Sequence, residues 1–170
     1  MGSSSFQVVA VNKSTRRPTQ IPDWWKLRYS SSVIGNECLV LPVEHVPTTV
    51  TSSCHEMKVP WSEIDIYGHT NFQSYIKFCF DAAAEAVKSD RYATFSGDIL
   101  RYNVATIQSL YISESCANDV LRVVSWQSPD DPKEVHFSIN KDDDGASKTL
   151  FQSCMRFYPL STDWTNKCIV

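Results

Sequence analysis

A single segment with a helical repeat stands between stretches that read as β-strand, and this order restricts the fold more than any other feature of the sequence. Between Phe72 and Lys88, apolar side chains recur every three or four positions. That spacing places them on one face of an α-helix. We therefore predict an amphipathic helix of about four to five turns, which Asn71 can cap through its side-chain oxygen. The predicted inner face holds Phe72, Tyr75, Ile76, Cys79, Ala83, Ala86 and Val87, and the outer face holds Ser74, Lys77, Asp81, Glu85 and Lys88.

Four strand-like segments follow the predicted helix. Residues 98–112, 119–127, 134–140 and 148–158 are rich in β-branched and aromatic side chains, and short turn-like stretches separate them. The last of these stretches contains Asp144-Gly145, which is a strong hairpin signal. The four segments therefore predict an antiparallel meander.

A further strand is expected before the helix, at residues 55–62. Met57, Val59 and Trp61 alternate with other residues there and share one face, as in a half-buried strand. One strand, one long helix and four more strands predict an α+β domain. In it, an antiparallel sheet of about five strands wraps around the helix and takes up its apolar face.

Composition bounds the size and the partners of this domain. The chain has 170 residues, of which 42% are hydrophobic and 21% charged, so it is long enough for one globular domain with a core. No stretch is apolar enough to predict a membrane span. The formal net charge of -3 gives no reason to expect nucleic acid as a partner, because such proteins usually carry a basic excess. A small or protein-borne substrate fits better.

The cysteines and histidines give no sign of a metal centre. His45, His55 and His136 lie far apart, and no two cysteines are spaced as in a C-x-x-C motif. We read the cysteines as reduced structural residues, which predicts a reducing compartment such as the cytoplasm. The N-terminal and C-terminal segments lack a signal-peptide core and a lipidation motif. The six cysteines are Cys38, Cys54, Cys79, Cys116, Cys154 and Cys168.

The first fifty residues read as a lead-in to the domain. Residues 6–12 suggest a short strand, residues 14–25 a linker with two prolines, and the segment from Pro22 a possible short helix. The segment from Lys13 to Arg28 contains five basic residues and only one acidic residue, an aspartate. This basic segment is either a solvated linker or a docking surface for an anionic partner.

The turn before the helix joins an acid, a glycine, an imidazole and an amide within seven residues. Asp65, Gly68, His69 and Asn71 each have an ordinary structural explanation: a turn residue, a left-handed position, a polar residue beside the core, and a helix cap. Together, and directly before a helix N-terminus, they also form a candidate catalytic or ligand-binding site.

The same turn resembles a known family. The heptapeptide Asp65-Ile66-Tyr67-Gly68-His69-Thr70-Asn71 is similar to the signature turn of hotdog-fold acyl thioesterases. Residues 11–23 and 61–76 resemble the acyl-ACP thioesterases, which hold two hotdog units in one chain. The resemblance implies that this chain begins at the end of a first unit, contains one complete unit, and pairs as a homodimer. The implied parts are the lead-in (1–53), a hotdog domain (54–160) and a tail (161–170).

The resemblance also implies roles for individual residues. Asp65 corresponds to the acid that attacks or activates water, His69 to the residue that positions the thioester, and Asn71 to a recurrent polar residue. Tyr67 replaces an asparagine of the family, and with Gly68 it is expected to contact the substrate.

The family also carries a catalytic glutamate next to a cysteine. Aligning residues 100–106 with the family strand places Ala105 and Thr106 there, so one carboxylate is missing. Thr106 is then expected to line the substrate site.

The implied activity is hydrolysis of fatty acyl thioesters carried by acyl carrier protein or coenzyme A, without a metal or an organic cofactor. The alternative is a hotdog protein that binds acyl chains without turnover. An acyl-thioester dehydratase on the same fold is a third possibility. Acyl carrier protein is acidic, so the docking alternative for the basic segment makes that segment the expected binding surface for this carrier.

Overall fold

The computed structural model describes residues 9–15, 17–32, 41–143 and 145–159, and the following account concerns these residues. They fall into two compact units, Met1–Pro42 and Val43–Val170. The whole of the expected tail, residues 161–170, lies outside the described residues.

The first unit contains the short helix expected after Pro22. Helix α1 spans Asp23–Tyr29, and a 3-10 turn, Ser30–Ser32, continues it. The expected strand at 6–12 lies partly outside the described residues. In its described part, Val11 forms an isolated antiparallel bridge with Pro18.

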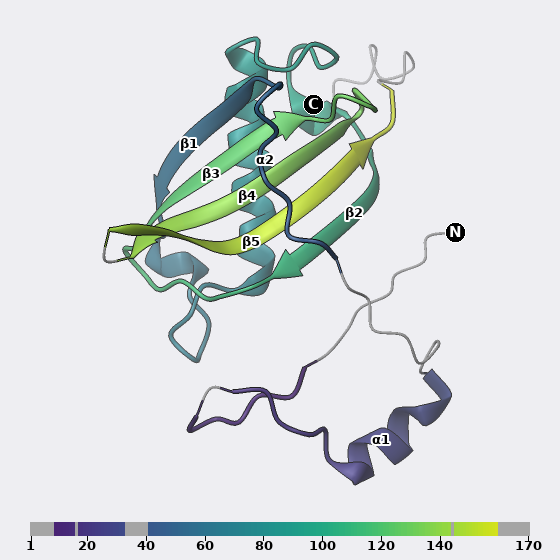
Figure 1. Ribbon diagram of the computed structural model, residues 1–170, viewed down its shortest axis with the longest axis vertical. Coiled ribbons are helices and arrows are strands. Elements are labelled where there is room, and N and C mark those ends of the chain that lie inside the picture. The colour runs from purple at the N-terminus through teal and green to yellow at the C-terminus, as the bar shows by residue number, and fades with distance from the viewer. Residues whose placement is uncertain (1–8, 16, 33–40, 144, 160–170) are drawn as a thin grey trace, which may run out of the picture. The chain divides into compact units, whose positions relative to one another are not determined.

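The second unit is built on one antiparallel sheet (Figure 1). Its order is β1-β3-β4-β5-β2, so the last strand, β5, lies between β4 and β2. All four pairings are antiparallel. The strands are β1 (Ser52–Lys58), β2 (Val104–Tyr111), β3 (Val120–Gln127), β4 (Glu134–Asp143) and β5 (Ala146–Phe157).

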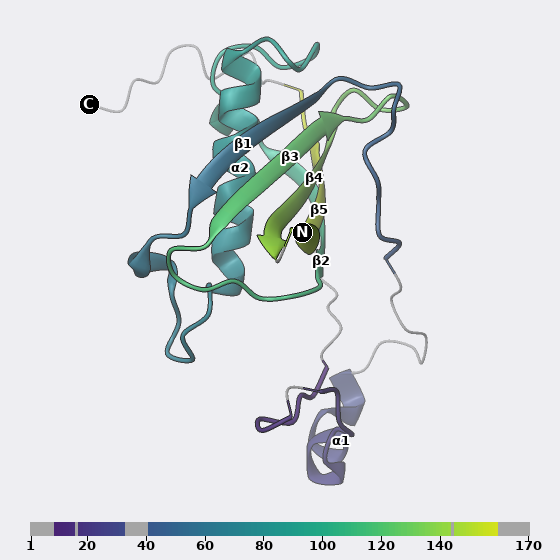
Figure 2. The same ribbon diagram turned by 60° about the vertical axis from the view of Figure 1, so that its left-hand side comes forward.

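One long helix covers one face of this sheet. Helix α2, Phe72–Lys88, has 17 residues and lies behind the sheet in Figure 1 and beside it in Figure 2. Asn71 caps it, since the Asn71 side-chain oxygen accepts a hydrogen bond from the Gln73 amide at 3.1 Å. The predicted α+β class, the long helix, its cap and the five-stranded sheet are confirmed.

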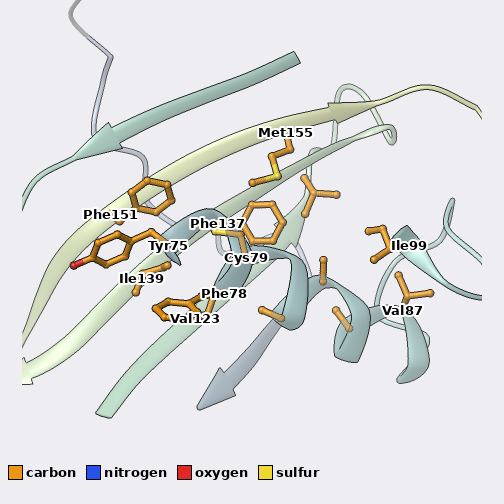
Figure 3. Packing of buried hydrophobic residues seen from close by; sticks show 14 of the residues in the cluster. Tyr75, Phe78, Cys79, Val87, Ile99, Val123, Phe137, Ile139, Phe151 and Met155 are labelled. Atoms are coloured by element: carbon orange, nitrogen blue, oxygen red, sulfur yellow. The ribbon is translucent and has the colours of Figure 1, made fainter. Parts of the chain in front are cut away.

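The core lies between α2 and the sheet, as Figure 3 shows. Phe78 and Cys79 of α2 point toward the strands, with 2% and 0% of their surface exposed. Register explains the sheet side of this contact: Val123, Ile139 and Phe151 are paired across three strands and are all fully buried. Burying a side chain of this size stabilises the fold by about 1.5–3 kcal/mol.

The predicted faces of α2 are wrong at two positions in its first turn. Phe72 is 62% exposed, whereas Ser74 is 2% exposed. Ser74 can be buried because its hydroxyl donates to a Glu63 carboxylate oxygen at 2.5 Å, and a satisfied polar group costs little to bury. Phe72 instead lies at the helix start, edge-on to Tyr111.

Two predicted strands are shorter than expected. Residues 98–103 do not join β2, because Asp98 accepts a hydrogen bond from the Leu100 amide and caps a 3-10 turn, Ile99–Arg101. The strand expected at 55–62 ends at Lys58, and Trp61 lies in the 3-10 turn Trp61–Glu63 with 73% of its surface exposed. Pro60 cannot donate to a strand ladder, so the strand stops before it.

The outer face of the sheet, opposite α2, is crossed by residues 43–50 (Figures 1 and 2). Glu44 holds this segment to β5: its amide donates to the Gln152 side-chain oxygen at 2.9 Å, and its carbonyl accepts from the Gln152 amide group at 2.6 Å. Gln152 is 7% exposed, so the segment satisfies a polar side chain that would otherwise be buried without partners.

The Glu63 carboxylate links the 3-10 turn to α2 through two hydrogen bonds, and a substitution of Glu63 tests their contribution to stability. Its carboxylate accepts from Ser74 at 2.5 Å and from Lys77 at 2.6 Å. These bonds, that from Lys77 first, hold the pKa of Glu63 below its ordinary 4.5. The carboxylate therefore stabilises the folded state above pH 4.5, and this contribution is lost as pH falls through the lower folded pKa.

We expect Glu63→Gln to lower the free energy of unfolding by about 1 kcal/mol at pH 7, and the difference from the native chain to shrink below pH 4.5. Urea denaturation between pH 3 and pH 8, with the exposed Glu56→Gln as the control, measures this. A difference that stays constant with pH would contradict the assignment.

Candidate functional site

The turn that joins the 3-10 segment to α2 is closed at both ends by backbone pairing. Ile64 and Thr70 form an antiparallel bridge, and the Asp65 amide donates to the His69 carbonyl at 2.8 Å. Gly68 has a φ of 83°, a backbone region that side-chain-bearing residues rarely adopt. The backbone pairing and the glycine conformation therefore fix the path of the heptapeptide, and they place Asp65 and His69 opposite each other across the turn.

The Asp65 carboxylate supports this turn through one oxygen. Oδ1 accepts hydrogen bonds from the backbone amides of Tyr67, at 2.8 Å, and His69, at 3.2 Å. Among the described residues, no hydrogen bond reaches Oδ2. Asp65 thus stabilises the turn, in agreement with its structural explanation from the sequence. Its second carboxylate oxygen remains available for chemistry.

Asn71 lies at the helix start, and Ile66 and Tyr67 lie at the tip of the turn. The side-chain oxygen of Asn71 is occupied by the helix cap, and the backbone amide of Asn71 donates to the Glu63 carbonyl at 2.8 Å. Ile66 and Tyr67 stand at the tip, with 92% and 70% of their surface exposed. Asn71 therefore acts on the site through the helix start.

The His69 imidazole contacts a carboxylate that sequence reasoning missed. Its Nε2 lies 3.2 Å from Oε1 of Glu114, a residue just past the end of β2. The His69 side chain is 24% exposed and that of Glu114 is 49% exposed. The turn thus brings together an aspartate, a histidine and a glutamate at the start of α2.

A buried hydrogen-bond cluster around Ser115 holds the Glu114 segment against the turn. The Thr70 amide donates to the Ser115 carbonyl at 2.8 Å, and the two hydroxyls lie 2.7 Å apart. The Tyr75 hydroxyl accepts from the Ser115 amide at 3.0 Å and lies 2.9 Å from its hydroxyl. Because Ser115 is 1% exposed, these bonds fix the backbone beside Glu114.

The structure does not bring Thr106 to this turn. The other end of β2 lies there: the Tyr111 hydroxyl donates to the Phe72 carbonyl at 3.0 Å. Thr106 pairs with Arg156 and is five residues back along β2, a distance of about 17 Å in a strand. Ala105 precedes it in the same strand.

A glutamate and a cysteine do follow β2 closely in the chain. Glu114 lies two residues before Cys116, directly after β2. Placing the family's glutamate at this pair, instead of at Ala105 and Thr106, would have found the contact with His69.

Large apolar side chains surround the turn without being buried. Their exposure ranges from 46% to 92%, far above that of core residues, and several belong to the turn itself or to the helix start. They are Trp61, Ile66, Tyr67, Phe72 and Tyr111.

A group of possible metal ligands exists in the described part of the chain, but it lies on the outer face of the sheet and not at this turn. Neither described helix combines the length and the apolar character that crossing a bilayer requires.

Comparison with solved structures identifies the fold. A 12:0-ACP thioesterase from Umbellularia californica matches with a TM-score of 0.62 and 14% identity, over 88% of this chain and 53% of that chain. An acyl-ACP thioesterase from Bacteroides thetaiotaomicron matches with a TM-score of 0.54 and 18% identity, over 87% and 53%. This chain spans about half the length of these two proteins.

A shorter match is an acyl-CoA hydrolase from Staphylococcus aureus, whose structure holds butyryl coenzyme A. Its TM-score is 0.51 and its identity 13%, over 66% of this chain and 67% of that chain. No family model matches the sequence, and no curated protein matches it either. The chain has the hotdog fold found in these thioesterases, as the resemblance of its turn implied.

Proposed function

We propose that the protein hydrolyses fatty acyl thioesters to a free acid and a thiol. One observation carries this proposal: the Asp65 turn meets the His69–Glu114 pair at the N-terminus of the long helix of a hotdog fold. Thioester hydrolysis needs a group that activates water, a donor to the carbonyl oxygen and an orienting partner. The three side chains and the helix start supply groups of each kind.

The roles follow from which atoms are already engaged. Oδ2 of Asp65 takes a proton from water, which attacks the thioester carbon, and that proton then goes to the departing thiolate. Since the Nε2–H of His69 faces Glu114, Nδ1 of the neutral ring is an acceptor, so it holds the attacking water, and backbone amides at the start of α2 donate to the carbonyl oxygen. The positive end of the α2 dipole favours the negative charge that develops there.

The acyl chain needs an apolar slot, and we propose that a second hotdog unit completes it. The exposed Trp61, Ile66, Tyr67 and Phe72 leave apolar surface around the turn. A second copy of this chain, in a homodimer, would cover that surface. Light scattering coupled to size exclusion tests this, and a monomer would exclude it.

The carrier is proposed to be acyl carrier protein or coenzyme A. Lys13, Arg17 and Arg28 of the first unit are exposed and basic, and both carriers present negative charge. If the basic segment docks the protein carrier, then neutralising these residues raises the KM for acyl-ACP more than the KM for acyl-CoA.

A second candidate function is binding of an acyl thioester without turnover. The observation that favours it is that Oδ1 of Asp65 and the side-chain oxygen of Asn71 already have structural partners in the turn and the cap. A site whose polar groups serve the backbone can hold a ligand without attacking it.

One experiment separates the two functions. We expect the native chain to release thiol from acyl-CoA or acyl-ACP substrates in a panel from short to long chains, and Asp65→Asn to lower the rate by about 10²- to 10⁴-fold. Asparagine keeps the oxygen that accepts from the turn amides, so the fold should persist. His69→Ala should also lose most of the activity.

A matched control is Asp90→Asn, because Asp90 is exposed and has a φ of 53°, which asparagine tolerates. It should leave the rate unchanged. Binding of every substrate with no turnover by the native chain would reject hydrolysis in favour of the second candidate.

A further inference from the structure

Three residues with metal-binding side chains meet on the outer face of the sheet. Glu134 and His136 are two positions apart on β4, and Cys154 is the residue of β5 paired with His136. One ligand atom from each lies within 4.8 Å of the other two. The thiol, imidazole and carboxylate come from neighbouring strands, which hold them in fixed register.

His136 sits between two carboxylates. Its Nε2 lies 3.1 Å from Oε1 of Glu134, and its Nδ1 contacts a carboxylate oxygen of Glu44. The side chain is only 13% exposed, and its ring stacks on Trp126 with centroids 5.4 Å apart. A neutral imidazole carries one N–H, so a neutral ring can satisfy only one of the two carboxylates.

The nearest basic residue in the ladder does not supply the missing positive charge. Arg156 is paired with Glu134, but its Nε donates to Asp131 at 2.8 Å. Cys154 adds a further potential anion, although burial, followed by the Glu134 carboxylate, raises the pKa of its thiol to about 12. The cluster is thus rich in ligand atoms and short of cations.

We propose that Glu134, His136 and Cys154 bind a Zn²⁺ ion, with Glu44 as the partner that orients His136. Zinc favours this mixture of sulfur, nitrogen and oxygen, and tetrahedral bonds of about 2.0–2.3 Å place ligand atoms roughly 3.3–3.8 Å apart. The present separations are all within 4.8 Å, so they must shorten by up to about 1 Å to fall within this range. On binding, Cys154 releases its thiol proton to solvent, and water takes the fourth position.

The Glu44 carboxylate lies where zinc sites commonly place the partner of a ligating histidine, although the contact has the distance of an ion pair and not the geometry of a hydrogen bond. A ligating histidine commonly donates its second ring N–H to a carboxylate, which fixes the tautomer and strengthens the ligand. Here Nδ1 faces Glu44, so Nε2, on the side of Glu134, is the nitrogen directed at the ion.

The site would link two neighbouring strands of the sheet. It joins β4 to β5 on the face opposite α2 and, through Glu44, ties the segment 43–50 to the sheet. The sequence expectation of no metal site rested on spacing along the chain. In a sheet, ligands also come from i,i+2 and cross-strand neighbours, a pattern that Glu134, His136 and Cys154 follow.

Titration of the tag-free full chain, stripped with a chelator, tests the proposal with metal ions alone. We expect one equivalent of Zn²⁺ in calorimetry and a rise of several degrees in the thermal midpoint. Co²⁺ at the same site should give the near-ultraviolet band of a cobalt–thiolate bond. Cys154→Ser should abolish that band, whereas Cys54→Ser, which removes an exposed thiol of the same sheet, should keep it.

Two further variants keep the test decisive if Cys154→Ser does not fold. Glu44→Gln leaves all three ligands and should weaken Zn²⁺ binding by about 10- to 100-fold, and Glu134→Gln should weaken it more. Absence of Zn²⁺ binding to the native chain, or a cobalt–thiolate band that survives Cys154→Ser, would overturn the proposal. Activity is not used as a readout, so the result is independent of the proposed hydrolase function.

Discussion

Replacing Glu114 with glutamine is expected to lower kcat/KM for acyl-thioester hydrolysis by about a hundredfold. Glu114 lies 3.2 Å from Nε2 of His69, and a carboxylate in that place fixes the orientation and the tautomer of the ring. Glutamine is nearly isosteric but uncharged. The ring then loses its orienting partner, while Asp65 and the turn stay in place.

Glu114 acts through His69, so its removal should show more than a loss of rate. We expect most of the change in kcat, because the proposed substrate-binding surface around Trp61 and Tyr67 is untouched. The pH profile of kcat/KM should also change shape, since the carboxylate that faces the imidazole is gone. Glu114→Asp should restore part of the rate. A merely structural role for Glu114 predicts neither the altered profile nor the partial recovery.

A matched control is Glu85→Gln, which neutralises an exposed glutamate farther along α2 that pairs with Lys88. It should leave the rate within a factor of two or so, because surface changes away from the site alter little. Full activity in Glu114→Gln would reject the role of Glu114 while leaving the hydrolase proposal intact. A native chain that hydrolyses no substrate would reject the hydrolase proposal itself.

The elements of this fold could be read from the sequence because their signals are local. The repeat of α2 and the β-rich segments after it need only neighbouring residues to be recognised. The errors at Phe72 and Ser74 arose where a contact from outside the helix decided burial. Glu63 supplies a partner for the Ser74 hydroxyl, and no helical periodicity contains that information.

The residues of the candidate site also fall into those that local sequence predicts and those that only the tertiary fold brings together. Asp65, His69 and Asn71 lie in one short turn, so the sequence could place them together. Glu114 reaches His69 only because β2 ends at the start of α2 and Ser115 bonds to Thr70, 45 residues away in the chain. Contacts of that kind depend on strand order, which follows from packing of the whole sheet. The three residues of the proposed zinc site also meet only through the pairing of β4 with β5.

Replacing Phe151 with alanine is expected to lower the free energy of unfolding by about 3–5 kcal/mol. Phe151 is fully buried, stacks on Tyr75 with centroids 5.4 Å apart, and packs edge-on against Tyr111 at 4.8 Å. Alanine removes these contacts and leaves a cavity that the rigid sheet cannot close. Urea denaturation measures the change, and a loss of that size is a large share of the 5–15 kcal/mol of a typical domain.

Phe151→Ala should also disturb the candidate site, because the two aromatic rings that pack against Phe151 hold the backbone of that site through their hydroxyls. The Tyr75 hydroxyl binds Ser115 beside Glu114, and the Tyr111 hydroxyl binds the Phe72 carbonyl at the start of α2. Phe151→Leu, which nearly conserves volume, should cost less than about 1.5 kcal/mol. Tyr158→Ala, at a side chain that is 57% exposed, should change stability by no more than about 0.5 kcal/mol. Equal losses in Phe151→Ala and Tyr158→Ala would show that the aromatic stack does not support the fold, and the site would then have to be positioned by the Ser115 hydrogen bonds alone.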